Sequence, residues 1–109
     1  MTAIHTINVH ELNQLMKENK SLCLIDVREP DEWQEGHIPG ALHLPRSQLP
    51  SLIRAHVSDL QTPIYLYCRG GVRSLYAAQA LADLGFKELY SIDGGIMEWQ
   101  SAGYTVVSE

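Results

Sequence analysis

Residues 63–74 read PIYLYCRGGVRS, and this stretch decides the fold because it joins an apolar strand to a helix through a tight turn. Its first five residues form a short hydrophobic segment of the kind found in buried parallel strands. Beyond the turn, a helical face is predicted by the spacing of Leu75, Ala78, Leu81, Ala82 and Leu84, and Gly85 follows as a stop signal. Cys68 therefore stands at a strand-to-helix turn.

The turn around Cys68 is predicted to bind an anion and to activate the thiol. Gly70 and Gly71 let the backbone curl, and Arg69 and Arg73 flank the curl. Turn amides and a helix N-terminus favour negative charge, and arginine keeps its positive charge at neutral pH. Each feature lowers the thiol pKa, which we expect within about 3.5–7.5. A thiolate in such a cup is a nucleophile suited to a small anionic substrate.

The second cysteine, Cys23, has a different setting. It lies in the apolar run LCLI at residues 22–25, with no nearby cation or glycine turn, so we expect a small buried hydrophobe. Two cysteines in unlike settings do not indicate a disulfide framework. A reducing cytoplasm is the simplest compartment, and it keeps Cys68 available.

Size and composition exclude several classes of function. The 109 residues predict one domain over residues 1–109, and 45% apolar residues are typical of a soluble globular protein. The net charge of −5 disfavours nucleic acid and anionic membranes as partners. No apolar run is long enough to span a membrane, and the first residues lack the pattern of a secretion signal.

The whole chain alternates between predicted strands and helices. Strands are expected at residues 4–7, 22–27, 41–44, 63–67 and 89–92, and helices at residues 9–18, 29–35, 47–57 and 96–102 as well as after the Cys68 turn. Asn8 and Glu11 have the spacing of a capping box for the first helix. Such alternation predicts a mainly parallel sheet covered on both faces, with ligands at the carboxyl ends of its strands. Asp26 and Cys68 both lie at such ends.

Three segments spread over most of the chain carry a family resemblance. The first is DVRE at residues 26–29 with WQEGHIPGA at residues 33–41, the second is the Cys68 turn, and the third is DGGIMEW at residues 93–99 with AGY at residues 102–104. Together they resemble the rhodaneses, or thiosulfate sulfurtransferases, in their single-domain form. Trp33 stands where the family more usually has Phe or Tyr, and Ile96 where it often has Trp, and neither departure touches the thiol.

The resemblance implies a rhodanese-like three-layer α/β/α sandwich around a mainly parallel five-stranded sheet, and no cofactor. It also implies that a six-residue loop from Cys to Arg goes with sulfur transfer, whereas a seven-residue loop goes with the related dual-specificity phosphatases. Cys68 through Arg73 is six residues. With Cys68 as the catalytic residue, the expected substrate-binding residues are Arg69, Gly70, Gly71, Val72, Arg73 and Ser74. Asp26 and Arg28 are candidates for the rim of the active site.

Other polar and aromatic residues have competing interpretations. We favour a structural role for Asp26 over direct chemistry, and for His37 the family comparison favours hydrogen bonding within the turn at residues 36–41 over a general base. Ser74 either donates its hydroxyl to the bound anion or caps the following helix, and the sequence does not decide between these. Trp33 and Trp99 are expected in the core. The other histidines lack ligand spacing with the cysteines, so no zinc site is inferred.

These observations predict a sulfurtransferase. Cys68 would attack the outer sulfur of a small anionic donor such as thiosulfate, become a persulfide, and pass that sulfur to cyanide or a thiol. An alternative is a persulfide carrier that takes sulfur from one protein and delivers it to another, with identical local chemistry. The intact cysteine disfavours a non-catalytic interaction domain, and the short loop disfavours a small phosphatase or arsenate reductase.

Overall fold

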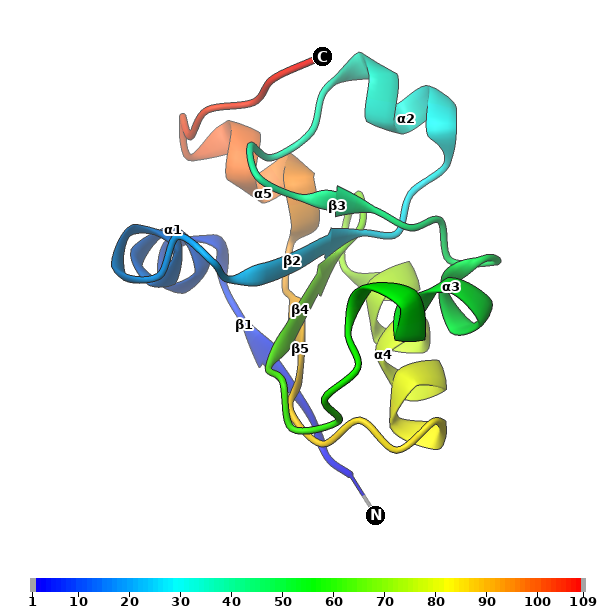
Figure 1. The fold of residues 1–109 in the computed structure, drawn as a ribbon. Helices are drawn as coiled ribbons and strands as arrows, with labels where there is room; N and C mark the ends of the chain where they lie inside the picture. Colours follow the sequence, from blue (N-terminus) through cyan, green and yellow to red (C-terminus); the bar gives the residue numbers. More distant parts are fainter. Residues whose placement is uncertain (1, 109) are drawn as a thin grey trace.

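The computed structural model describes residues 2–108, so Met1 and Glu109 lie outside it, and it shows alternating strands and helices (Figure 1). The strands are β1 (Ile4–Ile7), β2 (Cys23–Asp26), β3 (Leu42–His43), β4 (Ile64–Tyr67) and β5 (Leu89–Ile92). The helices are α1 (Val9–Glu18), α2 (Pro30–Glu35), α3 (Leu49–His56), α4 (Val72–Asp83) and α5 (Gly95–Ser101). Every expected element is therefore present, with its ends shifted by at most two residues.

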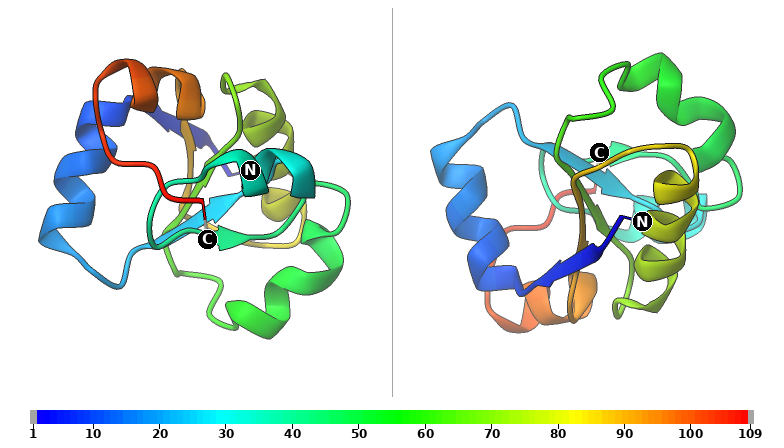
Figure 2. Two further views of the ribbon diagram at one scale, coloured as in Figure 1. Left: turned by 90° about the horizontal axis from the view of Figure 1, so that it is seen from above. Right: turned by 90° about the horizontal axis from the view of Figure 1, so that it is seen from below.

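The strands form one parallel sheet in the order β1-β5-β4-β2-β3. Helices α1 and α5 cover one face, and α3 and α4 cover the other (Figures 1 and 2). Helix α2 lies outside both layers, next to the C-terminal segment, where His37 and Val107 form an isolated antiparallel bridge. The predicted three-layer α/β/α sandwich is confirmed. No helix within residues 2–108 is long and apolar enough to cross a membrane.

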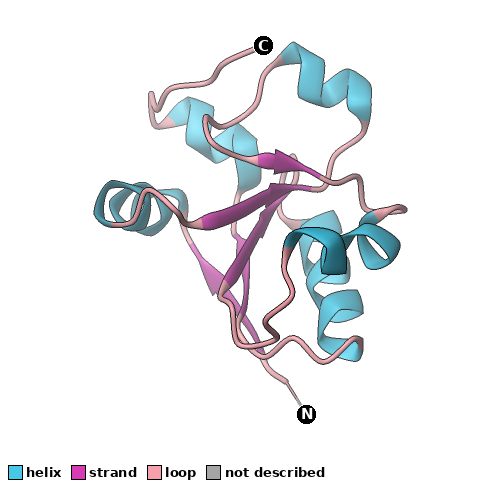
Figure 3. Ribbon diagram, in the orientation of Figure 1, coloured by secondary structure: helices cyan, strands magenta, loops and turns pink. Residues whose placement is uncertain are grey.

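The central strand β4 determines the direction of the thiol. β4 is buried along its length and is enclosed by helices in Figure 3. Ile64 and Leu66 pack toward α3 and α4, whereas Tyr65 and Tyr67 pack toward α1 and α5. Because side chains alternate along a strand, Cys68, the next residue, faces the α4 side and joins its core cluster. The N-terminus of α4 and the thiol therefore lie on the same side of the sheet.

Local sequence signals account for several other features. The capping box of α1 is confirmed, since Asn8 Oδ1 accepts the Glu11 N–H at 2.9 Å and Glu11 Oε1 accepts the Asn8 N–H at 3.0 Å. Trp99 is buried as expected. Trp33 is not in the core: it is half-buried and stacks between two histidine rings outside the sheet. Cys23 is half-buried rather than fully buried, and it packs against the edge of the α4-side core.

The first turn of α5 supports the Cys68 turn from behind. Ile96 N–H donates to the Cys68 carbonyl at 3.0 Å, and Met97 N–H donates to the Arg69 carbonyl at 3.1 Å. Gly95 makes this approach possible, because a Cβ there would lie 2.5 Å from both carbonyl oxygens, and its φ of +55° also favours glycine. The segment at residues 93–99 thus helps to determine the position of the turn that carries Cys68.

We predict that Gly95→Ala destabilises the protein and displaces the Cys68 turn. Its positive φ alone costs about 1–3 kcal/mol, and the collision with two carbonyl oxygens adds to this cost. Gly103→Ala is the matched control, because Gly103 has a φ of +83° with open space around its Cβ position. Urea unfolding and the alkylation rate of Cys68 would be measured for both. Equal losses of stability with unchanged alkylation rates would contradict the proposed role of the close contact.

Candidate active site

Cys68 lies in a closed turn between β4 and α4. Its side chain is only 1% exposed, and its sulfur accepts the Gly71 N–H at 3.1 Å. Gly71 has a φ of +113°, and a Cβ there would approach the backbone of residues 92–94, so glycine suits this position. The predicted strand-cysteine-turn-helix arrangement is confirmed, and it points the Gly71 amide at the sulfur.

The environment of Cys68 lowers its thiol pKa from the ordinary value. Burial by itself raises this pKa, but hydrogen bonds from the Ser74 hydroxyl and from the backbone amides of Ser74, Gly71 and Gly70 outweigh that effect. Cys23 has no such donors, and burial raises its pKa. The pKa values of the two thiols are therefore shifted in opposite directions, as the sequence predicts.

Ser74 connects the thiol to a second buried hydroxyl. Its Oγ lies 3.6 Å from the Cys68 sulfur, donates to the Gly71 carbonyl at 3.1 Å, and lies 2.7 Å from the Oγ of Ser91 on β5. Both hydroxyls are buried. Ser74 is therefore not a helix cap, because its hydroxyl donates to the Gly71 carbonyl and accepts no backbone N–H of α4, whereas donation to a bound anion stays a prediction.

Ser91 is a site residue that the sequence analysis missed. It lies inside β5, a segment whose sequence indicates only a strand. The available signal was a hydroxyl within an otherwise apolar strand, since buried polar groups need hydrogen-bond partners. That signal says that a partner exists, but only the register of β5 beside β4 shows that the partner is Ser74.

Arg73 is paired with a carboxylate from another element. Its Nη1 and Nη2 donate to the two oxygens of Glu32 on α2, at 2.7 and 2.9 Å. This hydrogen bonding lowers the pKa of Glu32 to about 2 and raises that of Arg73. The guanidinium is therefore near the turn, as expected, but it is bound to Glu32, a partner that the sequence does not predict.

The other turn residues lie at the protein surface. Gly70, Arg69 and Val72 are exposed, and Arg69 borders a cavity of about 430 Å³ next to the turn. The cavity is lined by Arg28, Glu32, Glu35, Gly36, Arg69, Ile96, Met97, Gln100 and Ser101. Guanidinium and carboxylate groups are thus mixed in the cavity beside the turn, and this side of the turn is less uniformly positive than its sequence alone indicates.

The two rim candidates form a buried ion pair. Asp26 is fully buried and accepts the Arg28 side chain at Nε and Nη2, the latter at 2.7 Å. It also accepts the Arg28 backbone N–H at 2.8 Å, and Arg28 Nη2 donates to the Gly36 carbonyl at 2.6 Å. This network braces the end of β2 against the turn after α2. Arg28 reaches the cavity wall, while Asp26 lies behind it, in keeping with a structural role.

His37 lies in a structural hydrogen-bonded stack. Its Nδ1 bonds the Trp33 carbonyl at 2.9 Å, and its ring stacks on Trp33 with 3.4 Å between ring centroids. The hydrogen bonds of His37 therefore go to Trp33 on α2 and to Val107, and not to its own turn at residues 36–41 as expected. Within residues 2–108, no group of three His, Cys, Asp or Glu side chains is arranged to hold a metal ion.

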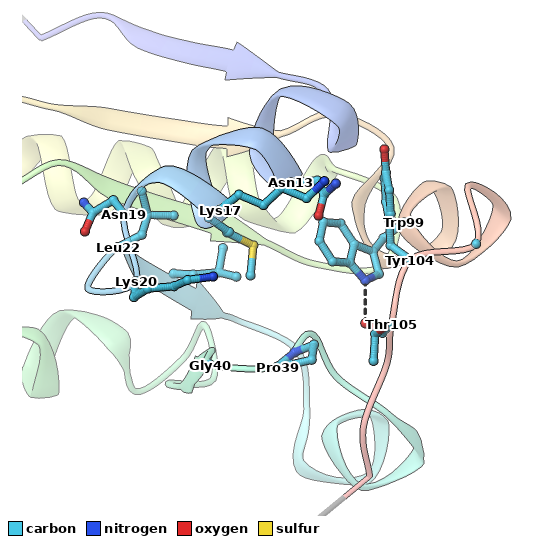
Figure 4. A pocket seen from close by; sticks show the side chains of 13 residues that line it. Asn13, Lys17, Asn19, Lys20, Leu22, Pro39, Gly40, Trp99, Tyr104 and Thr105 are labelled. Carbon is cyan, nitrogen blue, oxygen red and sulfur yellow. Dashed lines mark hydrogen bonds between the residues drawn. The ribbon is translucent and has the colours of Figure 1, made fainter.

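A second cavity, of about 590 Å³, lies on the α1 side of the molecule (Figure 4). It runs between α1 and the segment at Pro39, with Trp99 and Tyr104 at one end, and the Trp99 indole N–H donates to the Thr105 carbonyl at 2.8 Å. None of its lining residues is a cysteine, histidine, aspartate or glutamate. The thiol of Cys68 does not reach this cavity, which is therefore separate from the candidate active site.

Known proteins resemble this chain in sequence and in structure. Thiosulfate sulfurtransferase GlpE of Shewanella oneidensis is 35% identical over 102 residues, which cover 94% of this chain and 98% of that protein. The uncharacterized protein YqhL of Bacillus subtilis is 47% identical over 76 residues, which are 70% of this chain but only 59% of YqhL. A rhodanese-related protein of Thermoplasma volcanium superposes with a TM-score of 0.82 at 30% identity, covering 96% of this chain and 99% of that structure.

The family model for the rhodanese-like domain matches residues 8–102. These residues include all three segments that carry the resemblance in sequence, except the last two of residues 102–104. They also include the thiol-bearing turn, its support from α5 and the strands of the central sheet from β2 onward. The chain therefore belongs to the rhodanese-like domain family.

Proposed function

We propose that this chain acts as a single domain that moves sulfane sulfur through a persulfide on Cys68, from a donor such as thiosulfate to cyanide or a thiol. The observation that carries the proposal is the Cys68 sulfur, buried in a six-residue turn and accepting the Gly71 N–H at 3.1 Å. Membership of the rhodanese-like family and likeness to a thiosulfate sulfurtransferase support sulfur transfer in general. The residues of this chain perform the chemistry without a cofactor.

The proposed cycle has two covalent steps. The Cys68 thiolate attacks the outer sulfur of thiosulfate, the sulfur–sulfur bond of the donor breaks, and sulfite leaves with the bonding electrons. The acceptor then attacks the outer sulfur of the Cys68 persulfide, and the cysteine sulfur leaves as a thiolate. The turn amides that lower the thiol pKa also stabilise negative charge on the outer sulfur. This scheme predicts ping-pong kinetics.

The hydroxyl pair at Ser74 and Ser91 fits the change of charge at Cys68. In the neutral thiol, the S–H can donate to Ser74 Oγ while Ser74 donates to the Gly71 carbonyl. When the sulfur is a thiolate, it needs a donor, and Ser74 supplies one by turning its hydroxyl toward the sulfur. Ser91, at 2.7 Å, can then donate to Ser74 Oγ, which makes Ser74 a stronger donor. Ser91 is a positioning residue in this scheme.

The mixed charges beside the thiol favour a second candidate function, the protein persulfide carrier. Glu32 accepts hydrogen bonds from both Nη atoms of Arg73, so these donors are not free for a substrate. Glu35 lies in the same cavity as Arg69. These carboxylates repel a dianion such as thiosulfate. A carrier would show a high KM for thiosulfate and fast transfer from the persulfide of a partner protein.

Substitution of the two cysteines tests the proposed nucleophile. Cys68→Ser is expected to abolish turnover, because an alcohol cannot form the persulfide, whereas Cys23→Ser keeps turnover with at most a moderate loss of stability. Intact mass after incubation with thiosulfate should show one added sulfur atom in wild type and in Cys23→Ser only. Thiosulfate-dependent turnover by Cys68→Ser would refute the role of Cys68.

Neutralising Glu32 should improve the use of thiosulfate. Glu32→Gln releases Arg73 and removes a negative charge, so KM for thiosulfate should fall about threefold to tenfold, or roughly 0.7–1.4 kcal/mol. Glutamine can keep the capping bond to the Glu29 N–H. Because the Glu32 pKa is about 2, lowering the pH to about 5 should not reproduce the effect in wild type.

Glu35→Gln is the control for this change, since Glu35 lies in the same cavity but Arg73 bonds Glu32. It should lower KM less than Glu32→Gln does. An unchanged or higher KM in Glu32→Gln would show that the ion pair holds Arg73 in its working position and does not compete with the donor.

Removing the Ser91 hydroxyl should make Cys68 less acidic. Ser91→Ala is expected to move the pH profile of Cys68 alkylation upward and to slow alkylation at pH 7 about threefold to tenfold, the effect of one weakened hydrogen bond. Ser74→Ala should do at least as much. In the Ser74→Ala background, Ser91→Ala should change nothing further, because its effect passes through Ser74. Additive effects of the two substitutions, with both variants folded, would contradict the proposed action of Ser91 through Ser74.

A further inference from the structure

The first turns of α4 expose a row of apolar side chains directly after the Cys68 turn. Val72, Leu75 and Tyr76 are 65%, 42% and 59% exposed. Their spacing of three and four residues places them on one helix face. We call these three residues the α4 apolar stripe. Single exposed apolar residues are ordinary, but a contiguous group beside a reactive thiol indicates a contact surface.

Two arginines give this surface a positive charge. The Arg46 guanidinium lies over the ring of Tyr76, 5.0 Å from its centroid, and Arg69 is exposed on the turn itself. Among residues 2–108, the salt bridges involve neither of them. Glu32 and Glu35 lie in the cavity that Arg69 borders, but Arg46 and Arg69 beside the stripe complement acidic side chains of a partner.

The depth of the thiol explains why a docking surface is useful. Cys68 is 1% exposed, so an acceptor must bring its sulfur into the turn. Cyanide and small thiols diffuse there without any need for apolar contacts. A cysteine carried by a protein segment has to be oriented, and its neighbours would meet α4 and the arginines as the sulfur enters.

We propose that the α4 apolar stripe, with Arg46 and Arg69, docks a partner protein that exchanges sulfur with Cys68 through a cysteine in an acidic and apolar segment. This proposal rests on the proposed persulfide chemistry. The partner thiolate attacks the outer sulfur of the Cys68 persulfide, a new sulfur–sulfur bond forms on the partner, and Cys68 leaves as a thiolate. The reverse step loads Cys68 from the partner. A second copy of this chain fits less well, because it would bring the same arginines into one interface.

Peptide thiols test the surface without knowledge of the partner. The probes are acetyl-Asp-Leu-Cys-Phe-Asp-amide and acetyl-Lys-Ser-Cys-Ser-Lys-amide, used as acceptors from Cys68 persulfide, with cyanide as a small acceptor. Wild type should transfer to the acidic peptide about tenfold faster than to the basic one. Tyr76→Ser and Arg46→Glu should each lower the rate with the acidic peptide about fivefold or more and leave the rate with cyanide unchanged.

Leu84→Ser is the matched control, because Leu84 is 41% exposed at the far end of the same helix. It should leave both rates unchanged. An equal loss in Leu84→Ser, or a parallel loss with cyanide in Tyr76→Ser, would overturn the proposal. So would a wild-type dimer in analytical ultracentrifugation that Tyr76→Ser converts to a monomer, because the stripe would then be covered by a second copy.

A binding measurement separates this proposal from the proposed function. The ligand is a fluorescein-labelled acidic peptide with serine in place of cysteine. It should bind wild type, and its Kd for Tyr76→Ser and for Arg46→Glu should each be at least fivefold higher. This readout needs no sulfur transfer. If Cys68 gained no sulfur from thiosulfate, the proposed function would fail while the docking surface could still be confirmed. If all variants bound the peptide equally, the docking surface would be wrong even with the persulfide intact.

Discussion

The Cys68 sulfur is buried and yet its pKa is lowered, so hydrogen-bond donors must point at it, and this requirement organises the structure around Cys68. Gly71 and Ser74 supply the donors, and the alternation of side chains along β4 turns the sulfur toward them. The turn can hold this shape because the first amides of α5 bond the Cys68 and Arg69 carbonyls from behind. Strand β4, helix α4 and helix α5 are thus held in positions that keep several backbone N–H groups directed at the Cys68 sulfur.

The parts of the fold that the sequence predicts are those with local causes. The apolar run before Cys68 predicts a buried central strand, and the spacing of Asn8 and Glu11 predicts the start of α1. The structure confirms both predictions. The strand-to-helix turn is equally local, since two glycines and the following helical pattern define it. Each of these signals lies within about one element, so no knowledge of long-range packing is required.

The parts that the sequence does not predict depend on pairing between distant elements. The partner of Arg73 is Glu32, from a helix 41 residues away, and other acidic residues of the same segment would have satisfied the sequence equally well. Ser91 reaches Ser74 only because β5 pairs with β4 in a particular register. Trp33 carries the composition of a core residue, but α2 lies outside both layers, so its ring stacks on His37 instead. The charge or polarity of a residue indicates that it needs a partner in the folded protein, but it does not identify which residue the partner is.

Different groups lower the Cys68 pKa and form the surface around the turn, and this separation affects how specificity for a sulfur donor or acceptor can arise. Amides and a hydroxyl lower the Cys68 pKa, and these groups are fixed by the fold. The arginines near the turn are consequently free for other contacts: Arg28 braces β2, Arg73 holds Glu32, and Arg69 is exposed. Because the chemistry of the thiol does not depend on their charge alone, the side chains around it can select the donor and acceptor. A change of sulfur partner would then require new surface residues while the turn stays the same.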